Sequence, residues 1–278
     1  MRIKRCAAVH DISCIGKCSL TVALPVLSAM GIEVACLPTA VLSTHTAGFH
    51  GFTFHDLTDE LPKITAHWKR ENIQLDAIYT GYLGSAAQLD FVSGFIDQFR
   101  TPDTAVIIDP VMADNGKLYV GFTPEFALNM GKLCAKADVI VPNMTEAVFM
   151  LGETLPEKYD REWIHALQRR LATLGAKKVV ITGVSYEPGK LGCATYDSET
   201  GIFDEYFTEQ LPVAMHGTGD VYASTFTGAY MNGKSLIEAA VEACEFTVAC
   251  IRATMDDMEN HWYAVKFEKC LHLLTKYE

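Results

Sequence analysis

The sequence lacks a hydrophobic run long enough to cross a membrane. Its most apolar window, residues 20–32, contains Thr21, Pro25 and Ser28 and is shorter than the roughly 18–20 residues that a membrane-spanning helix needs. Asp11 interrupts the basic start of the chain before a hydrophobic stretch forms, so this start does not match a secretory signal peptide. We therefore expect a cytoplasmic protein with no membrane partner.

The sequence also lacks an excess of positive charge. Its 23 basic and 34 acidic residues give a formal net charge of −11, which argues against nucleic acid or an anionic membrane as the main partner. A small anionic ligand is compatible with this charge, because backbone N–H groups can hold a phosphate locally. Hydrophobic residues make up 49% of the chain, which excludes intrinsic disorder.

Motifs for zinc and for dinucleotides are missing as well. The nine cysteines include no Cys-x-x-Cys pair, and Cys14 and Cys18 lack the further ligands of a zinc site. We interpret the cysteines as scattered reduced thiols. No Gly-x-Gly-x-x-Gly follows the first predicted strand, which argues against a Rossmann dehydrogenase, and a P-loop ATPase is not expected either.

Strand-like and helix-like segments alternate along the chain. Apolar runs predict strands at residues 3–10, 32–38, 76–81, 104–111, 137–143 and 177–183. Periodic or capped segments predict helices at 17–30, 56–71, 85–100, 144–151 and 160–174, and one more that opens at Thr123-Pro124-Glu125. Strands around 192–197 and 201–208 predict a hairpin, and the last helices are expected at 218–231, 235–253 and 258–276.

This alternation predicts an α/β fold with a doubly wound, mostly parallel sheet, helices on both faces and a local antiparallel hairpin. No linker, repeat or low-complexity tract interrupts residues 1–278, so we expect a single domain. In such sheets ligands bind beyond the carboxyl ends of the strands. The candidate functional residues are therefore those that follow strands.

The segment Gly217-Thr218-Gly219-Asp220 opens a predicted helix. Its two glycines let the backbone approach a ligand closely, so the N–H groups at the helix start can converge on an anion. Asp220 could accept a proton from a hydroxyl while these N–H groups hold a phosphoryl group, as phosphoryl transfer requires. The structural alternative is a turn in which Thr218 caps the helix and Asp220 satisfies its dipole.

Acidic residues follow two other predicted strands. Asp109 and Asp114 could hold Mg²⁺ and its phosphates, or they could be a strand end and a solvated turn before Asn115-Gly116. Asn143 and Glu146 have the spacing of a helix capping box, and Glu146 could also orient the water around a metal. Each pair thus has a structural and a functional interpretation.

A fourth group combines polar and aromatic side chains. His45 and Thr46 follow one strand and Tyr82 follows another, which suits recognition of a flat polar heteroaromatic ring. A lone buried histidine is more often structural. All four groups are predicted at the same edge of the sheet, so together they indicate a site more strongly than each does alone.

Together these motifs resemble the ribokinase superfamily. Gly-Thr-Gly-Asp at 217–220, Asn-x-x-Glu at 143–146 and Asp-Pro-Val-Met at 109–112 carry this resemblance. Ser-x-His-Thr at 43–46 and Thr-Gly-Tyr-Leu-Gly-Ser at 80–85 are similar to pyridoxal and pyridoxamine kinases. The resemblance implies a ribokinase-like fold, ATP-dependent phosphorylation of the 5′-hydroxymethyl group of vitamin B6 compounds, and a homodimer.

The resemblance also implies a role for each matching residue. The catalytic base corresponds to Asp220, and the anion hole to Gly217, Thr218 and Gly219. The acidic positions that arrange Mg²⁺ and, in many members, a monovalent cation such as K⁺ correspond to Asp109, Asp114 and Glu146. The ATP phosphates are expected near Asn143, Thr182 and Ser185. The pyridine pocket corresponds to His45, Thr46 and Tyr82, with His10, Asp11 or Ser13 beside the ring.

Two departures from the pattern leave alternatives open. Val141 stands where many pyridoxal kinases have a threonine, whose hydroxyl would help to build a potassium site. His216 is reminiscent of hydroxymethylpyrimidine (phosphate) kinases, but these usually have cysteine at the position of Asp220 and a glycine-rich segment in place of 13–17. Such a pyrimidine kinase of thiamine synthesis is one alternative, and a non-catalytic protein that binds a B6 compound or a nucleotide is the other.

Overall fold

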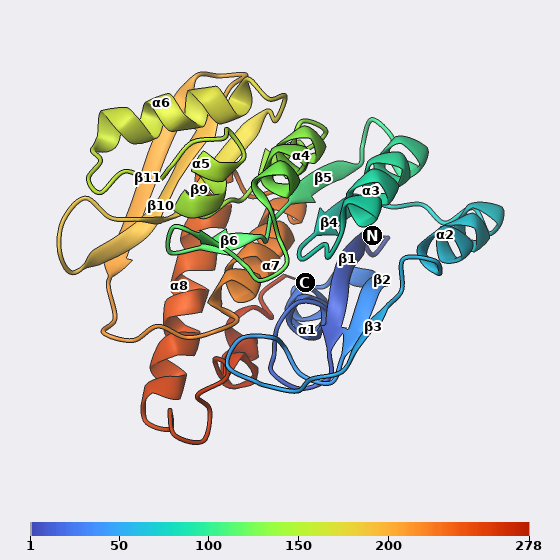
Figure 1. The fold of residues 1–278 in the computed structure, drawn as a ribbon, viewed down its shortest axis with the longest axis horizontal. Coiled ribbons are helices and arrows are strands. Elements are labelled where there is room, and N and C mark those ends of the chain that lie inside the picture. The colour runs from blue at the N-terminus through green and yellow to red at the C-terminus, as the bar shows by residue number, and fades with distance from the viewer. Residues whose placement is uncertain (1, 278) are drawn as a thin grey trace.

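The computed structural model describes residues 2–277, and most of its strands belong to one large sheet (Figure 1). The strands are β1 (Arg5–Ser13), β2 (Glu33–Leu42), β3 (Phe54–Asp56), β4 (Ala77–Thr80), β5 (Ala105–Ile108), β8 (Val139–Ile140), β9 (Lys178–Val184), β10 (Lys190–Asp197) and β11 (Ile202–Glu209). Across the sheet their order is β11-β10-β9-β8-β5-β4-β1-β2-β3. A separate small hairpin pairs β6 (Ala113–Asp114) with β7 (Lys117–Leu118).

The central strands run parallel, and antiparallel strands occur only towards the two sides of the described sheet. β2, β1, β4, β5, β8 and β9 are parallel neighbours. The predicted hairpin β10–β11 pairs antiparallel with β9, and β3 pairs antiparallel with β2. This arrangement confirms the predicted α/β fold with a mostly parallel sheet and a local hairpin.

Helices cover both faces of the sheet, which explains why its central strands are apolar throughout. In β5, Val106 and Ile108 point into one buried cluster and Ile107 into the other, as the two-residue period of a strand requires. The first cluster is closed by α2 (Leu61–Arg70), α3 (Ala86–Phe99), α4 (Pro124–Cys134), α5 (Met144–Phe149) and α6 (Arg161–Ala172). The second is closed by α1 (Leu20–Ala29), α7 (Thr218–Met231) and α8 (Leu236–Met255) (Figure 1). None of the helices within residues 2–277 has the length and apolar character to cross a membrane.

The helix predicted to begin near Asp56 starts later. Asp56 Oδ1 accepts a hydrogen bond from the Thr58 N–H (2.7 Å), so this carboxylate closes a turn instead of capping a helix. α2 begins only at Leu61, and residues 54–56 form the edge strand β3, which was not predicted. Similarly, the loop expected around Asn115-Gly116 contains the short strands β6 and β7.

The helix predicted at 258–276 is not formed. The chain reverses after α8, where the Lys266 N–H donates to Thr254 Oγ1 (2.8 Å). Four consecutive residues, 264–267, are buried, whereas a surface helix would bury only one stripe of its residues. Only two one-turn 3₁₀ helices are present here, Phe267–Lys269 and Leu271–Leu273, because tertiary burial overrides the helical pattern.

A fully buried histidine lies near the end of β1. The ring of His10 packs edge-on against Tyr79, with the ring centroids 4.5 Å apart. Neither of its ring nitrogens has a hydrogen-bond partner within the part of the chain that the structure describes. Gly81 makes room for the ring, because a Cβ there would lie 2.3 Å from His10 Nδ1. Burial lowers the pKa of His10 to about 3, so the ring is neutral in the folded protein.

We expect His10 to weaken the fold as the pH falls. Below the ordinary histidine pKa of 6.5 the unfolded chain binds a proton at this position, and the folded protein does not until about pH 3. The free energy of unfolding therefore loses up to about 1.4 kcal/mol per pH unit in this window. His10→Leu removes this contribution, so urea denaturation between about pH 4 and 5.5 should give a correspondingly flatter pH dependence than wild type. Equal slopes would contradict a buried neutral histidine.

Candidate active site

Most of the predicted site residues lie at the carboxyl ends of the central strands. β2 and β4 lie on opposite sides of β1, and such a reversal of strand order opens a crevice at the edge of the sheet. Asp11 and Ser13 are near the end of β1, and Tyr82 follows β4. Asp109 and Asn143 follow β5 and β8. The topology therefore brings together residues that are far apart in the sequence.

The start of α7 has the geometry of an anion-binding turn. Gly217 precedes the helix with φ 79°, and a Cβ at this position would lie 2.6 Å from the carbonyl oxygen of Lys17. The first helical hydrogen bond runs from the Val221 N–H to Gly217 O (3.0 Å), and in the described chain the N–H groups of 218–220 have no partner. Free N–H groups at the positive end of a helix attract anions. Position 217 therefore requires glycine, because the backbone has a positive φ and a Cβ would overlap the carbonyl oxygen of Lys17.

Four carboxylates lie near this turn. Burial is the main cause that raises the pKa of each, to about 7 for Asp220 and about 8 for Glu146, and upwards for Asp11 and Asp109. Repulsion adds to this effect, from Asp11 on Asp220 and from Glu146 and Asp220 on Asp109. No lysine or arginine among the described residues contributes to these pKa shifts. The site is therefore acidic without an internal counter-charge.

Asn143 and Glu146 form the predicted capping box at the start of α5. Asn143 Oδ1 accepts hydrogen bonds from the N–H groups of Thr145 (2.9 Å) and Glu146 (3.0 Å), and Glu146 Oε2 accepts one from the Asn143 N–H (2.8 Å). The same side chains hold the neighbouring hairpin: Glu146 Oε1 accepts from the Met112 N–H (3.1 Å), and Asn143 Nδ2 donates to Ala113 O (2.8 Å). The structural interpretation is thus realised, and each carboxylate oxygen keeps acceptor capacity for another ligand.

The hairpin β6–β7 carries an acid that faces solvent and an aromatic residue beside the site. Asp114 is exposed, and its oxygens accept hydrogen bonds from Asn115 N (2.8 Å) and Asn115 Nδ2 (3.0 Å). Tyr119 follows the hairpin with an exposed side chain, and partial desolvation raises its pKa, followed by repulsion from Glu146, Asp114, Asp109 and Asp220. Sequence reasoning missed Tyr119, because no polar pattern marks a single tyrosine in a loop.

The acidic residues suit a cation that arrives with a substrate. No group of three or more His, Cys, Asp or Glu side chains within 2–277 is already arranged around a metal position. Mg²⁺ rarely needs such a cage, since it usually keeps several waters and binds one or two carboxylates together with substrate phosphates. Asp109 and Glu146 are buried oxygen donors whose charge nothing nearby neutralises, and they fit that kind of site.

His45 has a structural task. Its Nδ1 accepts a hydrogen bond from the Ala47 N–H (3.1 Å), so Nε2 carries the proton and donates to Tyr263 O (2.8 Å). A Cβ at Gly16 would lie 2.1 Å from His45 Cδ2, which shows how closely the β1–α1 connection packs on the ring. Both ring nitrogens are therefore engaged within the protein, and only the face or edge of the ring could contact a ligand.

The other predicted substrate residues are divided between two places. Ser13 Oγ donates to Asp11 Oδ2 (3.2 Å), and Asp11 also contributes to the raised pKa of the half-buried Tyr82, after burial itself. The Tyr82 ring lies beside Phe122, with centroids 5.5 Å apart. Thr46 is exposed on the loop after β2. Asp11, Ser13 and Tyr82 thus form one neighbourhood, and Thr46 lies on the loop that His45 anchors.

The predicted phosphate residues are only partly brought together. Thr182 forms a parallel bridge with Asn143, and the Thr182 N–H donates to Pro142 O (2.9 Å). Ser185 Oγ donates to Glu187 O (3.1 Å), so this hydroxyl faces its own loop. Asn143 and Thr182 therefore share the strand edge, and within the described chain no hydrogen bond joins Ser185 to the acidic residues.

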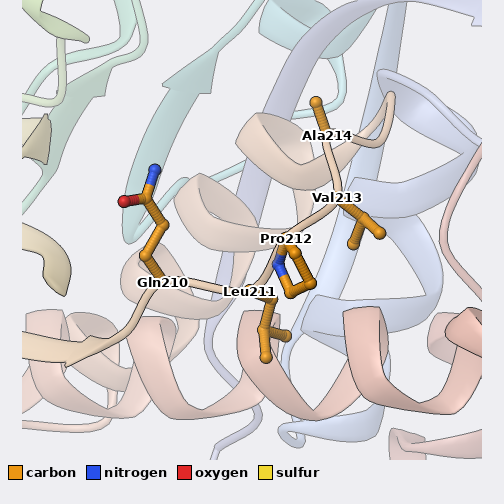
Figure 2. Close-up of a pocket in the computed structure, with 5 residues that line it drawn as sticks. All are labelled: Gln210, Leu211, Pro212, Val213 and Ala214. Carbon is orange, nitrogen blue, oxygen red and sulfur yellow. The ribbon is translucent and has the colours of Figure 1, made fainter. Parts of the chain in front are cut away.

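A groove of about 360 Å³ lies next to the anion-binding turn in the sequence. It is lined by Gln210–Ala214, the segment that joins β11 to α7. Figure 2 shows these residues along an extended stretch of chain, with Leu211 pointing towards α8. Sequence reasoning missed this groove, because its wall is irregular backbone without a chemical motif.

Residues 228–235, Gly-Ala-Tyr-Met-Asn-Gly-Lys-Ser, fit the P-loop consensus without forming a phosphate loop. They comprise the end of α7 and its connection to α8, whereas a P-loop joins a strand to a helix. Gly228 is inside α7, where a Cβ would lie 2.3 Å from Met30 Sδ. Ser235 Oγ donates to Glu238 Oε2 (2.7 Å) within the capping box of α8. We therefore assign no phosphate-binding role to this stretch.

Known proteins with similar sequences and structures point to the same class. The sequence profile of the phosphomethylpyrimidine kinase family matches residues 23–263. A crystal structure from Bacteroides thetaiotaomicron, described as a candidate phosphomethylpyrimidine kinase in a form with pyridoxal, is 44% identical with a TM-score of 0.94, and the match covers 98% of this chain and 96% of that one. Pyridoxal kinase from Lactobacillus plantarum is 32% identical with a TM-score of 0.89, over 98% and 97% of the two chains. Pyridoxal kinase from Arabidopsis thaliana is 30% identical over 194 residues, which are 67% of this chain and 61% of the plant protein.

The fold and the relatives define a kinase with a ribokinase-like fold. The chain belongs to the phosphomethylpyrimidine kinase family, and it is similar over most of its length to pyridoxal kinases. The predicted fold, the kinase activity and the resemblance to B6 kinases are thereby confirmed. The role of each site residue, the single domain, the cytoplasmic location and the homodimer stay predictions.

We expect Gly217→Ala to destabilise the protein and Gly219→Ala to be tolerated. A Cβ at 217 would meet the carbonyl oxygen of Lys17 at 2.6 Å and would sit on a residue with positive φ, which together should lower the free energy of unfolding by roughly 1–3 kcal/mol. A Cβ at 219 meets nothing within 4 Å, and alanine favours a helix. Urea denaturation measures both variants. A wild-type midpoint for Gly217→Ala would contradict the close approach.

Proposed function

We propose that the protein uses ATP to phosphorylate the 5′-hydroxymethyl group of pyridoxal, pyridoxine or pyridoxamine. The observation that carries this proposal is the position of Asp220 in a turn whose free N–H groups can hold a phosphoryl group. The Bacteroides relative crystallised with pyridoxal supports the substrate class. Membership of a kinase family supports ATP as the phosphoryl donor.

In the proposed reaction Asp220 is the catalytic base. Its carboxylate accepts the proton of the 5′-hydroxyl while the hydroxyl oxygen forms a bond to the γ-phosphorus of ATP. The bond from that phosphorus to the β–γ bridging oxygen breaks, and ADP leaves with the oxygen. The N–H groups at the start of α7, in the Gly217-Thr218-Gly219 turn, donate to the oxygens of the transferring group. A base with a pKa of about 7 is suited to proton transfer near neutral pH.

The remaining acids are proposed to arrange the metal and the nucleotide. Asp109, Asp114 and Glu146 would hold Mg²⁺ directly or through water, and for Asp109 and Glu146 this is supported by their burial without a cationic partner. Bound Mg²⁺ supplies positive charge to the ATP phosphates. The phosphates are proposed to lie near Asn143, Thr182 and Ser185, and the shared strand edge supports the first two. A monovalent cation such as K⁺ would find no hydroxyl at Val141, which is buried.

The substrate ring is proposed to lie between the end of β1 and the residues that follow β4. Tyr82 offers a half-buried aromatic face, and Asp11 and Ser13 offer polar atoms beside it. Thr46 adds a hydroxyl from the loop after β2. Since its nitrogens are engaged, His45 would contribute the surface of its ring.

A hydroxymethylpyrimidine (phosphate) kinase is the second candidate. The name of the family and the description of the Bacteroides relative favour it. His216 favours it as well: this residue is exposed directly before the anion-binding turn, with its ring centroid 5.7 Å from that of His45. A non-catalytic binding protein would have no need of Asp220 in this turn, so the site argues against that class.

A coupled assay that follows ADP production tests the proposal. Purified protein is supplied with ATP, Mg²⁺ and either pyridoxal, pyridoxine, pyridoxamine or hydroxymethylpyrimidine, with and without K⁺. We expect turnover with at least one B6 compound that exceeds turnover with the pyrimidine, and loss of turnover when Mg²⁺ is chelated. Turnover with the pyrimidine alone would establish the second candidate, and no turnover with any compound would support a binding protein.

We expect Asp220→Asn to lower kcat by roughly 10²–10⁴-fold, the usual contribution of a positioned base. Asparagine has nearly the same shape but cannot take the proton. The measurement is kcat with the preferred substrate and ATP, and a thermal melting curve shows whether the variant is folded. A folded variant with near wild-type turnover would remove Asp220 from the mechanism.

A further inference from the structure

The loop between β2 and β3, residues 43–53, is held by hydrogen bonds at its base but not at its tip. At the base, the Ser43 N–H donates to Thr53 O (3.1 Å), and the Thr53 N–H donates to Ser43 Oγ (2.9 Å). Within the described chain, no hydrogen bond joins residues 46–52 to any part of the molecule outside this loop. The position of the tip therefore depends on packing.

The tip packs against Trp262, a residue that follows α8. The Phe49 ring lies beside the indole of Trp262, with the ring centroids 4.8 Å apart and the ring planes at 48°. A Cβ at Gly48 would lie 2.8 Å from Trp262 Cζ3, so the glycine lets the backbone of the tip approach the indole closely. Aromatic pairs at such separations attract each other beyond the effect of the area that they bury. Trp262 therefore contacts two consecutive residues of the tip.

The residue after Trp262 holds the base of the same loop. Tyr263 O accepts the hydrogen bond from His45 Nε2 (2.8 Å), and the Tyr263 ring centroid lies 5.9 Å from that of Phe49. The rings of Phe49 and His45 are also in contact, with their centroids 4.9 Å apart. Two consecutive residues after α8 thus contact the loop at its tip and at its base.

The backbone that carries Trp262 is itself anchored to the end of α8. The ammonium group of Lys266 forms an ion pair with Asp257, and Asn260 Nδ2 donates to Asp257 Oδ1 (2.6 Å). The His261 N–H donates to Asp257 O (3.0 Å). These bonds close a turn directly before Trp262, so the indole is attached to fixed backbone.

The loop also lies beside the anion-binding turn. The ring centroids of His45 and His216 are 5.7 Å apart, and His216 directly precedes Gly217. Thr46, which is proposed to contact the substrate, follows His45 in the loop. The loop therefore connects Trp262 to the edge of the sheet at which the substrate ring is proposed to lie.

We propose that Trp262 is a positioning residue for the B6 substrate. By packing on Gly48 and Phe49, it keeps the loop in the conformation from which Thr46 and the ring of His45 contact the substrate. Without this packing the tip exchanges with conformations that do not bind, and the apparent dissociation constant rises in inverse proportion to the competent fraction. This inference rests on the proposed kinase reaction and extends it to a residue that belongs to none of the sequence motifs.

Substitutions at Trp262 test this role by steady-state kinetics. Trp262→Ala should raise the KM for the B6 substrate roughly fivefold, which corresponds to a competent fraction of about one fifth. The kcat and the KM for ATP should stay within about twofold, because Asp220 and the anion-binding turn are unchanged. Trp262→Phe keeps an aromatic ring and should recover most of the affinity. Leu273→Ala is the matched control and should change neither KM, since Leu273 also follows α8 and is 47% exposed, against 48% for Trp262.

Amide hydrogen exchange tests the loop without any turnover. In Trp262→Ala, peptides that contain residues 43–53 should exchange faster than in wild type, because the loop opens more often, whereas peptides from α7 should not change. Phe49→Ala removes the other half of the same contact. Combined with Trp262→Ala it should therefore raise the KM for the B6 substrate no further than either single change does.

The outcomes separate this role from the proposed reaction. An unchanged KM for the B6 substrate in Trp262→Ala, a raised KM without faster exchange of the loop, or an equal rise in the KM for ATP would each overturn the positioning role. Thermal melting shows whether Trp262→Ala is folded, and if it is not, Phe49→Ala carries the same prediction. No turnover of any B6 compound by wild type would instead overturn the proposed function, and the exchange data would still show whether Trp262 holds the loop.

Discussion

Buried carboxylates without a cationic partner are the constraint on which the rest of this site depends. Asp11, Asp109 and Glu146 are buried and Asp220 is half-buried; all four lie at one edge of the sheet, and loss of solvation raises the pKa of each. An ionised carboxylate in such a place is costly unless donors or an external cation compensate it. The fold must therefore supply donors, and it must leave the acids accessible to a ligand that brings positive charge.

The donors come from irregular backbone at the ends of regular strands. Glu146 accepts hydrogen bonds from the backbone N–H groups of Met112 and Asn143, so a helix cap and a hairpin share one carboxylate. The strained segment between β1 and α1 packs against the turn before Asp220, where the carbonyl oxygen of Lys17 lies 2.6 Å from the position of a Cβ at Gly217. The parallel strands provide the rigid frame, because hydrophobic cores on both faces fix their ends. The irregular backbone segments therefore lie at the strand ends, where their N–H groups can bond the carboxylates of the site.

The sequence was sufficient to predict the parallel core of the sheet and the positions of those candidate site residues that belong to glycine-containing and acidic motifs. The apolar runs and caps predicted α7 at residues 218–231, because both ends of that helix are set by local chemistry. The prediction of a helix at 258–276 was wrong, because contacts with α8 determine which of these residues are buried, and no local sequence pattern indicates those contacts. For the same reason the engagement of both nitrogens of His45 could not be read from its position after a strand.

The segment after β1 is one feature that bears on the choice between a B6 kinase and a pyrimidine kinase. Pyrimidine kinases are glycine-rich there, and glycine would adopt the φ values of Lys17 and Ser19 without strain. This chain instead keeps side chains at both positions, and the segment packs against Gly217 on one side and His45 on the other. Side chains at 17 and 19, together with the aspartate at 220, therefore match the pattern of the B6 kinases more closely than the glycine-rich segment and the cysteine usual in the pyrimidine enzymes, and this match supports the proposed substrate class.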